Sequence, residues 1–358
     1  MVHPIAKAKT LALCLLLAAM PACTKKDSAP QNELRLFTWS EYFPDEVIRE
    51  FEKENNAKVR VDYFSSNEQL LTKLQLSSGN AEEAYDLILP SDFIVKTMAE
   101  MKLLKELDHA SMPFLADFDP KAKPDYDPAM KYSVPMAIGT TGVAINTKLL
   151  PRFLKDAKNG ITWKEILESP EFKGKVTLLD DTKEVLQLGL LMNGKNIINA
   201  TEADVKTAFA YLKAHKAQLK GFTTETRPVI EADECAICMV YSGDALSVGK
   251  TKPEIIFLMP KDGATIWADN FAIPANARNP ALAYKFMAKV LSPEGGQRFT
   301  ERTGYRTPNT KARALLSKEV AANASIFPAL NPKQFHYLVE RKDLALLSDK
   351  EWALLKSL

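Results

Sequence analysis

Strand-like and helix-like segments alternate regularly in the first third of the chain, and this pattern constrains the fold most. Short apolar or alternating runs at 34–38, 58–64 and 85–89 are typical of strands, and amphipathic runs follow each of them. Parallel strands need a crossover connection, which is usually a helix. The sequence therefore predicts an α/β fold on a mainly parallel sheet with helices on both faces.

Strand-like and helix-like segments continue through the rest of the sequence. The total length of 358 residues suggests two domains. A second unit is expected to begin near Gly139–Gly142. In parallel sheets, ligands sit beyond the carboxyl ends of the strands. Trp39–Tyr42 and Ser91–Phe93 both follow predicted strand ends, so they are candidate site segments. Further elements are expected at 163–167, 175–179, 183–192, 203–215, 236–241, 255–259, 265–273, 281–291 and 295–302.

The first residues have the pattern of an export signal. Lys7 and Lys9 precede an apolar run that is too short to span a bilayer, and small residues then lead to Cys23. We expect a signal peptide at 1–22 and a polar tether at 23–32. Ala22 before Cys23 is similar to a bacterial lipobox, so Cys23 is a candidate for lipidation. Plain cleavage and an uncleaved helix are the alternatives.

Charge does not point to a nucleic-acid partner. Residues 1–22 hold two of the 47 basic residues and none of the 45 acidic ones, so the rest of the chain has no net charge. Basic clusters such as 213–220 lie in a helical pattern and are expected to form a solvated face. No other stretch is apolar enough to cross a membrane, so membrane contact is expected only through a lipid anchor.

Two cysteines, Cys235 and Cys238, lie close together in an apolar run. In a strand, residues three apart point to opposite faces, which disfavours a disulfide or a redox pair. We therefore expect two buried structural thiols. The few histidines show no metal-ligand spacing, and no metal or cofactor is expected.

Enzyme signatures are missing from the sequence. There is no G-x-S-x-G, no H-E-x-x-H, no P-loop and no G-x-G-x-x-G after a strand. The prediction is that the protein is not an enzyme. A carboxylate-based hydrolase is the alternative, because acidic residues are plentiful.

Two segments set a large aromatic residue beside a carboxylate. These are Trp39–Tyr42, which includes Glu41, and Trp267–Asp269. A flexible organic cation needs an anion for each ammonium group and a flat apolar wall for the methylenes between them. The Asp181/Glu184 pair and Asp244 lie between these segments and add candidate anions.

Five segments in order resemble the periplasmic spermidine/putrescine-binding proteins of ABC importers, over nearly all of 33–325. They are Leu36–Tyr42, Tyr85–Ser91, Leu179–Val185, Trp267–Pro274 and Gly304–Asn309. The resemblance implies a two-lobed type II periplasmic-binding-protein fold with a hinge and an interlobe ligand cleft. It places lobe 1 at 32–138 plus 270–307 and lobe 2 at 139–269 plus 308–358.

The resemblance also implies a set of ligand-binding residues. Aromatic residues would wall the ligand, Asp269 and Glu184 would each hold an ammonium group, and Asp244 matches an acid of putrescine-preferring relatives. The implied set is Trp39, Ser40, Glu41, Tyr42, Ser91, Phe93, Asp181, Glu184, Tyr241, Asp244, Trp267, Asp269 and Tyr305.

Several of these residues depart from the family pattern or have a plainer explanation. Tyr241 stands where tryptophan is usual, Phe93 where spermidine binders often have tyrosine, and Arg341 falls near a position that is usually glutamine. Asp181 and Glu184 also form a capping-box pattern. Asp244 is a candidate N-cap, the tryptophans are candidate core residues, and Tyr305 is a candidate turn residue. Asp269 is harder to explain this way, because burying an unpaired carboxylate is expensive.

The functional hypothesis is that two lobes close on a polyamine and deliver it to an ABC permease. The expected protein is a periplasmic monomer, without cofactor or metal. One alternative keeps the fold but makes the protein a polyamine sensor that docks on a membrane signalling receptor. Another keeps the fold and binds a different small solute; the acids disfavour a neutral sugar, and the tyrosine pair typical of ferric sites is missing.

Overall fold

The computed structural model describes residues 32–40, 42–77, 80, 83–119, 124–156, 159–329 and 335–358. The expected signal peptide, Cys23, nearly all of the expected tether and Glu41 lie outside these ranges. Within the described ranges, no helix combines the length and apolar character needed to cross a membrane. No cluster of three or more described His, Cys, Asp or Glu side chains is arranged to hold a metal ion.

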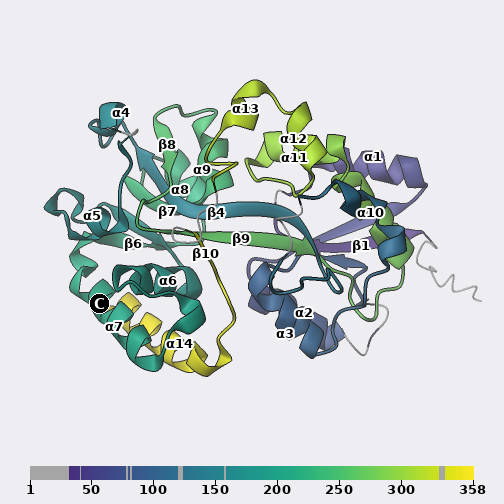
Figure 1. The fold of residues 1–358 in the computed structure, drawn as a ribbon, viewed down its shortest axis with the longest axis horizontal. Helices are drawn as coiled ribbons and strands as arrows, with labels where there is room; N and C mark the ends of the chain where they lie inside the picture. The colour runs from purple at the N-terminus through teal and green to yellow at the C-terminus, as the bar shows by residue number, and fades with distance from the viewer. Residues whose placement is uncertain are drawn as a thin grey trace, which may run out of the picture. The chain divides into compact units, whose positions relative to one another are not determined.

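The first sheet has three parallel strands in the order β2-β1-β3, and helices connect them along the chain (Figure 1). The predicted alternation of strands and helices is confirmed. The elements are β1 (Glu33–Thr38), α1 (Asp45–Asn55), β2 (Lys58–Tyr63), α2 (Asn67–Ser77), β3 (Leu87–Ile88) and α3 (Asp92–Glu100).

The second sheet has the strand order β10-β9-β4-β7-β5-β6, and β8 also pairs with β4. Its strands are β4 (Val134–Asn146), β5 (Val176–Leu179), β6 (Leu219–Thr223), β7 (Ile237–Tyr241), β8 (Ile255–Leu258), β9 (Ala264–Phe271) and β10 (Phe335–Tyr337). The helices of this part and of the C-terminal segments are α4 (Phe153–Asp156), α5 (Trp163–Glu168), α6 (Thr182–Met192), α7 (Glu202–Ala214), α8 (Thr226–Glu231), α9 (Ser242–Gly249), α10 (Pro280–Val290), α11 (Pro293–Thr303), α12 (Thr310–Leu315), α13 (Lys318–Ala322) and α14 (Lys342–Ser357).

Two long antiparallel strands, β4 and β9, connect the two sheets (Figure 1). Isolated bridges join Ile88 to Ala272 and Ser91 to Asp269, so the end of the first sheet meets the C-terminal part of β9. Every residue of β4 is buried. Strand β9 therefore passes from the second sheet to the edge of the first, and its residues can contact both.

Gly139 and Gly142 do not interrupt the strand; both lie in the middle of β4. A β-carbon at Gly139 would collide with the ring of Trp267, and one at Gly142 would lie 2.6 Å from the carbonyl oxygen of Leu258. The absence of side chains thus lets neighbouring strands carry large rings here. The position of the lobe boundary remains a prediction.

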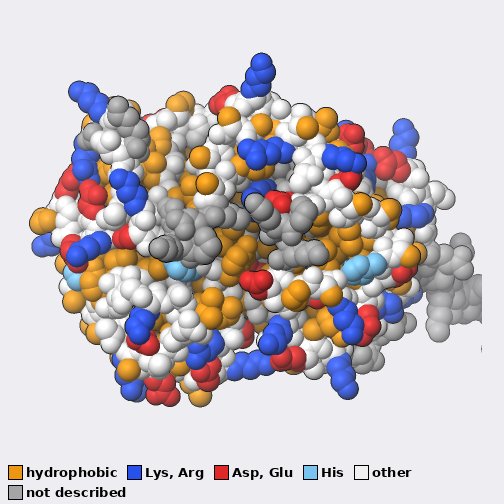
Figure 2. Space-filling view, in the orientation of Figure 1, with side chains coloured by type: hydrophobic (Ala, Val, Ile, Leu, Met, Phe, Trp, Pro, Cys, Tyr) orange, Lys and Arg blue, Asp and Glu red, His pale blue; other side chains and the backbone are white. Residues whose placement is uncertain are grey.

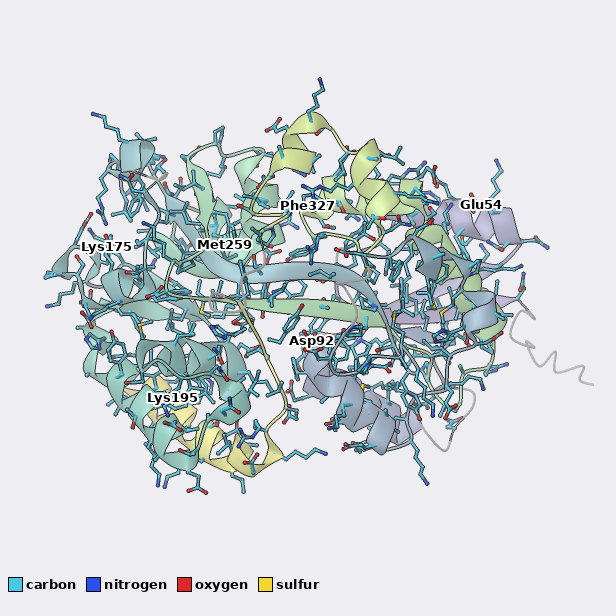
Figure 3. All side chains as sticks on the ribbon, viewed as in Figure 1. Glu54, Asp92, Lys175, Lys195, Met259 and Phe327 are labelled. Carbon is cyan, nitrogen blue, oxygen red and sulfur yellow. A yellow bond between two sulfur atoms is a disulfide. The ribbon has the colours of Figure 1, made fainter. Side chains whose placement is uncertain are left out.

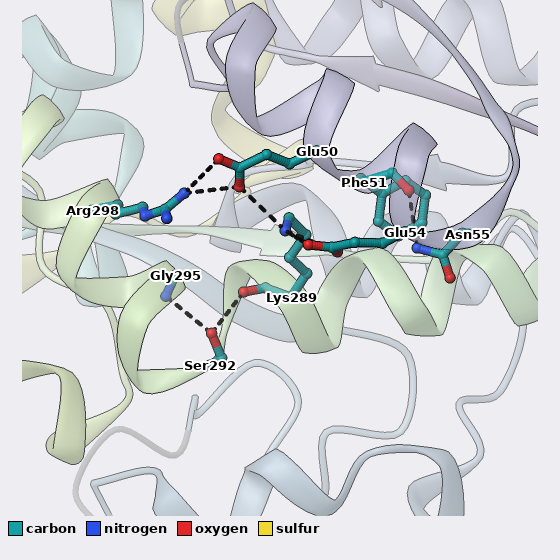
Figure 4. A network of polar contacts seen from close by, with 8 residues as sticks. All are labelled: Glu50, Phe51, Glu54, Asn55, Lys289, Ser292, Gly295 and Arg298. Carbon is teal, nitrogen blue, oxygen red and sulfur yellow. Dashed lines mark hydrogen bonds and ion pairs between the residues drawn. The ribbon is translucent and has the colours of Figure 1, made fainter.

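A network of ion pairs holds α1 against α10 and α11 (Figure 4). Glu50 accepts a hydrogen bond from Arg298 at 2.8 Å and lies 3.4 Å from the Lys289 ammonium, which also contacts Glu54 at 2.8 Å. A single surface ion pair contributes little to the stability of the fold, but a network in which several charges are shared contributes more. The network therefore holds α10 and α11, which come late in the sequence, against α1 beside the first sheet.

The prediction of two free thiols is wrong, because Cys235 and Cys238 form a disulfide. The strand argument failed since β7 begins only at Ile237. Cys235 lies in the irregular segment before the strand, and the bend at Ala236 brings the two α-carbons to 5.9 Å. This separation is within the range that a disulfide requires.

Candidate functional site

Strand β9 carries two of the predicted residues, Trp267 and Asp269, and both are buried. The Tyr42 hydroxyl donates a hydrogen bond to Asp269 Oδ2, and the Ser91 hydroxyl donates to Oδ1 at 2.6 Å. Burial raises the pKa of Asp269 to about 6, although the Ser91, Tyr42 and Trp39 donors oppose the rise. Three distant segments of the chain therefore meet at one buried carboxyl group.

Aromatic rings surround this carboxyl group. The ring of Trp267 lies edge-to-face with Tyr305 at 5.0 Å and with Tyr241 at 5.6 Å between centroids, and Tyr42 lies 6.1 Å from Tyr305. A β-carbon at Gly243 would collide with the Tyr305 ring, so glycine is needed there for the ring to fit. Tyr305 therefore packs within this cluster and does more than order its turn.

Asp181 and Glu184 stand at the start of α6, and they behave differently. Asp181 is the N-cap and accepts hydrogen bonds from the backbone N–H groups of Lys183 and Glu184 at 2.9 and 3.0 Å. The capping interpretation is thus correct for Asp181. Glu184 instead accepts a hydrogen bond from the Thr141 hydroxyl of β4 at 2.7 Å. Its side chain points toward the strands that connect the sheets.

The Glu184 carboxyl group is buried, with 2% of the residue exposed. Burial and the neighbouring Asp181 raise its pKa to about 8, while hydrogen bonds from Thr141 and Thr265 oppose the rise. Its second oxygen, Oε2, has no hydrogen-bond partner among the described residues. A buried acceptor without a partner is unusual and marks a position where a donor would be favourable.

Asp244 lies in the first turn of α9, which begins at Ser242, so its interpretation as an N-cap is wrong. Its carboxyl group accepts a hydrogen bond from Thr226 at 2.8 Å and a longer one from the Tyr305 hydroxyl at 3.4 Å. Burial raises its pKa, and the nearby charge of Arg227 opposes this. Tyr305 thus connects Asp244 to the aromatic cluster.

Tyr241, at the end of β7, packs against Trp267, and these carboxyl groups affect the pKa of its hydroxyl. Burial raises the pKa of its hydroxyl well above 10, and four acids add to the effect by repelling the phenolate charge. The four acids are Asp181, Glu184, Asp244 and Asp269.

The other predicted residues lie at the border of this cluster. Trp39 is half-buried and packs edge-to-face on Phe64, with 4.4 Å between ring centroids. Its indole N–H lies near Asp269 but forms no hydrogen bond with any residue that the structure describes. It joins two apolar clusters and so also serves the core. Ser40 is exposed, and the ring of Phe93 lies 4.7 Å from the Lys183 ammonium group.

Arg341 lies outside this group of acids and rings. Its guanidinium pairs with Asp343 at 2.7 Å and donates hydrogen bonds to the carbonyl oxygens of Ile197 and Ile198. These contacts fix its charge at the start of α14.

Asp92 is a site residue that sequence reasoning missed. It is almost fully buried at the first position of α3, and Figure 3 shows it beside β9. Its carboxyl group accepts hydrogen bonds from the backbone N–H of Ala268 at 3.0 Å and of Phe93 at 2.7 Å. Burial raises its pKa to about 8 and nearby Asp269 adds to this, while the backbone donors oppose it. An acid directly after a predicted strand end was the available signal.

A hollow of about 540 Å³ lies elsewhere, between β2 and α2. Asp62 and Tyr85 line it, but the Tyr85 hydroxyl already donates a hydrogen bond to Asp62 at 3.0 Å. Lys73 at its border pairs with Glu83 at 3.6 Å. Since these polar groups satisfy one another, the chemistry of the site lies in the buried acids and not in this hollow.

The outer face of the protein differs from this acidic interior. Figure 2 shows lysine and arginine side chains interspersed with acidic ones on the visible face. This agrees with the near-neutral charge of the chain.

Known proteins with similar sequences bind small molecules. Residues 46–329 match the family of bacterial extracellular solute-binding proteins. The chain is 33% identical to the spermidine/putrescine-binding periplasmic protein 1 of Haemophilus influenzae, over 87% of this chain and 88% of that one. It is 31% identical to the spermidine/putrescine-binding periplasmic protein of Escherichia coli, over 83% of each.

Solved structures agree with this relationship. A Listeria monocytogenes protein assigned to spermidine/putrescine ABC transport has a TM-score of 0.80 and 29% identity, over 91% of this chain and 99% of that one. The substrate-binding protein PotD of Streptococcus pneumoniae has a TM-score of 0.78 at 24% identity, over 91% and 99%. The chain therefore belongs to the bacterial extracellular solute-binding proteins and has their type II periplasmic-binding fold, and it is a solute-binding protein and not an enzyme.

Proposed function

We propose that this protein binds a polyamine of the putrescine/spermidine class between its two lobes and delivers it to an ABC permease. The observation that carries the proposal is the buried Asp269 carboxyl group, which Tyr42 and Ser91 bind, on the same strand as a Trp267 ring that packs on Tyr305 and Tyr241. Related proteins of the same family are named for binding spermidine or putrescine, and this supports the same ligand class here.

The buried acids explain why the ligand should be a cation with several charges. Two of them, Glu184 and Asp269, have pKa values raised to about 8 and about 6 because burial disfavours their charged forms. An ammonium group at about 4 Å contributes roughly 4 kcal/mol per contact at an effective dielectric of 20, before desolvation is subtracted. Two separated carboxyl groups therefore favour a ligand with an ammonium group at each end.

The rings explain why the chain between the charges should be aliphatic. Trp267, Tyr305 and Tyr42 form edge-to-face pairs around Asp269. Contact with an aromatic face stabilises an ammonium by about 0.5–2 kcal/mol. Methylene groups removed from water add roughly 25 cal/mol per Å². Together with two ion contacts, these terms are sufficient for micromolar affinity, about 8 kcal/mol, after association costs.

The proposed closure uses the strands that connect the sheets. Lobe 1 is proposed to comprise 32–138 plus 270–307, and lobe 2 the remaining 139–269 plus 308–358. Ligand that contacts acids of both lobes would shift the hinge toward the closed form. Bending is assigned to β4 and β9, since these strands run between the two sheets.

Export and anchoring complete the proposal. The family is extracellular or periplasmic, and we propose that Cys23 is acylated and holds a monomer at a membrane. Replacing Cys23 with serine should release the protein into the soluble periplasmic fraction, and metabolic labelling with a fatty acid should mark only the wild type. Equal fractionation and equal labelling of both proteins would remove the anchor from the proposal.

Calorimetry and thermal unfolding test the ligand class. Putrescine and spermidine should raise the unfolding temperature, because a ligand at 100 times its Kd stabilises the folded state by about 2.7 kcal/mol. Butylamine, which has one ammonium group, and glucose, which has none, should have little effect. Stabilisation by glucose without stabilisation by either polyamine would contradict the proposal.

A further inference from the structure

The outer edge of β9 changes its hydrogen-bonding partner in the middle of the strand. Up to Ile266 this edge pairs with β10, which belongs to the second sheet and runs beside β9 in Figure 1. The next N–H on the same edge is that of Ala268, and it donates to Asp92 Oδ2 at 3.0 Å. Asp92 follows β3 of the first sheet. The partner of β9 therefore changes from the second sheet to the first between Ile266 and Ala268.

Two further hydrogen bonds hold the same part of β9 to the end of the first sheet. The N–H of Asn270 donates to the carbonyl oxygen of Pro90 at 2.9 Å. The Ser91 hydroxyl donates to Asp269 Oδ1 at 2.6 Å. Together with Asp92, these residues clamp three consecutive residues of β9. This part of the strand is therefore expected to move with the first sheet.

Strand β4 changes its partner at the same level. Ile138 exchanges two backbone hydrogen bonds with Arg306, at 2.8 and 3.0 Å, whereas pairing with β7 of the second sheet begins at Thr141. Arg306 follows α11, which the ion-pair network holds against α1 (Figure 4). Gly139 lies directly opposite Trp267 in the ladder between β4 and β9. Both connecting strands therefore change their partners at this one cross-strand pair.

The pair of Gly139 and Trp267 is the point at which bending of the strands costs least. Residues on either side of it are tied to one sheet or the other, and breaking buried hydrogen bonds is costly. Rotation of the backbone at the pair itself leaves both sets of bonds intact. Glycine also has the widest range of backbone dihedral angles. Bending at this pair leaves Asp269 attached to the first sheet.

The Asp92 carboxyl group supplies the contact of the clamp that lies next to Trp267. It is almost fully buried, and its Oδ1 accepts a backbone N–H in the first turn of α3 at 2.7 Å. Its two oxygens thus join the helix to the strand. Ala268 is also buried, so without Asp92 its N–H would be a buried donor without a partner, which is rare in folded proteins.

We propose that Asp92 is a positioning residue for ligand binding, which anchors β9 to the first sheet so that the connecting strands bend at the Gly139–Trp267 pair. This inference rests on the proposed function. It moves Asp269 into lobe 1, although the family resemblance implies lobe 2, and it leaves Glu184 in lobe 2. Closure then brings together two carboxyl groups that each keep a fixed place in their own lobe.

The test measures amide hydrogen exchange by NMR and putrescine binding by calorimetry on the wild type, Asp92→Ala and Asp92→Asn. Alanine removes the acceptor, so the Ala268 amide should exchange about tenfold faster relative to that of Ile266. The Kd for putrescine should rise about tenfold, because the Asp269 carboxyl group loses support from behind. Asparagine keeps one oxygen for the Ala268 N–H and should hold both values within about threefold of the wild type.

Asp86→Ala is the matched control. Asp86 is equally buried beside the first sheet, but it accepts the backbone N–H groups of Arg35 and Asn279, away from β9. This variant should lower the unfolding temperature while leaving the Kd and the exchange ratio at their wild-type values. Crystal structures with and without putrescine should both keep the hydrogen bond from Ala268 to Asp92, and loss of this bond in either one overturns the inference.

Each other outcome has a definite meaning. An unchanged Kd in Asp92→Ala overturns the inference and leaves the proposed function intact. An Asp92→Asn variant as impaired as Asp92→Ala also overturns it, because the charge and not the hydrogen bond would then matter. Circular dichroism should show that the variants are folded, and Asp92→Asn decides the matter if Asp92→Ala is not. A wild type that binds neither putrescine nor spermidine refutes the proposed function and the role of Asp92 in binding together.

Discussion

Replacing Asp269 with asparagine should weaken binding and stabilise the ligand-free protein at the same time. Asparagine nearly preserves the size of the side chain and still offers an oxygen to the hydroxyl groups of Tyr42 or Ser91. It removes the charge that the proposed ammonium contact needs. Loss of one partner of a buried, hydrogen-bonded ion pair costs about 3 kcal/mol, which corresponds to a roughly 100-fold increase in Kd.

The stability effect follows from the raised pKa of Asp269. Its pKa is about 6 in the folded protein against an ordinary value of 3.8, so the folded state holds the proton more tightly than the unfolded state. The resulting destabilisation is absent below pH 4, grows as pH rises to 6 and is complete above it. At pH 8 it amounts to about 3 kcal/mol. Asparagine carries no such cost.

Thermal unfolding at pH 4 and pH 8, with and without putrescine, measures both effects. The ligand-free variant should be more stable than the wild type at pH 8, and their difference should shrink at pH 4. Asp86→Asn is the matched control, because Asp86 is equally buried but accepts backbone N–H groups of Arg35, Arg278 and Asn279. It should lose stability and keep its affinity. Unchanged affinity in Asp269→Asn, or a less stable variant at pH 8, would refute the reasoning.

Three further outcomes are expected. Polyamine binding at pH 7 should release protons, because the pKa of Glu184 is about 8 and a bound ammonium group favours the charged form of its carboxyl group. The affinity for the polyamine should therefore fall as the pH falls below 8. Calorimetry in buffers of different ionisation enthalpy should detect the released protons. Gly139→Ala should weaken binding at least tenfold by displacing the Trp267 ring, measured by ligand titration of tryptophan fluorescence; an unchanged affinity would contradict this role. Cys235 and Cys238 should resist alkylation until a reductant is added. Replacing both with serine should lower the free energy of unfolding by about 2 kcal/mol, measured by chemical unfolding, because the loop that the disulfide closes is short. Rapid alkylation of the untreated, denatured protein would show that the thiols are free.

Patterns that depend on local periodicity were predictable from the sequence. The strand and helix alternation before Leu104 needed only the positions of apolar residues, and the structure reproduces it. Asp269 was also identifiable, because a carboxylate inside an apolar strand needs a special explanation. The structure gives that explanation through the hydroxyl groups of Tyr42 and Ser91, which are distant in sequence.

Features that depend on tertiary contacts were not predictable in the same way. Asp92 looked like an ordinary helix-start acid until its bond to the Ala268 N–H was visible. The cysteine argument applied strand geometry to the whole run from Cys235 to Cys238, whereas β7 begins only at Ile237. The close approach of the Trp267 ring to Gly139 joins two strands that are distant in sequence, so it could not be inferred from the glycine alone.

The placement of Trp267 and Asp269 on β9 has a consequence for anyone who would turn this protein into an optical sensor. The connecting strand itself carries candidate ligand contacts, so altering its stiffness will also alter affinity. Helices α2 and α6 approach each other through Glu68 and Lys183 at the solvent-exposed edge. Dyes attached to exposed positions of these helices, away from Glu184, would report the proposed opening motion.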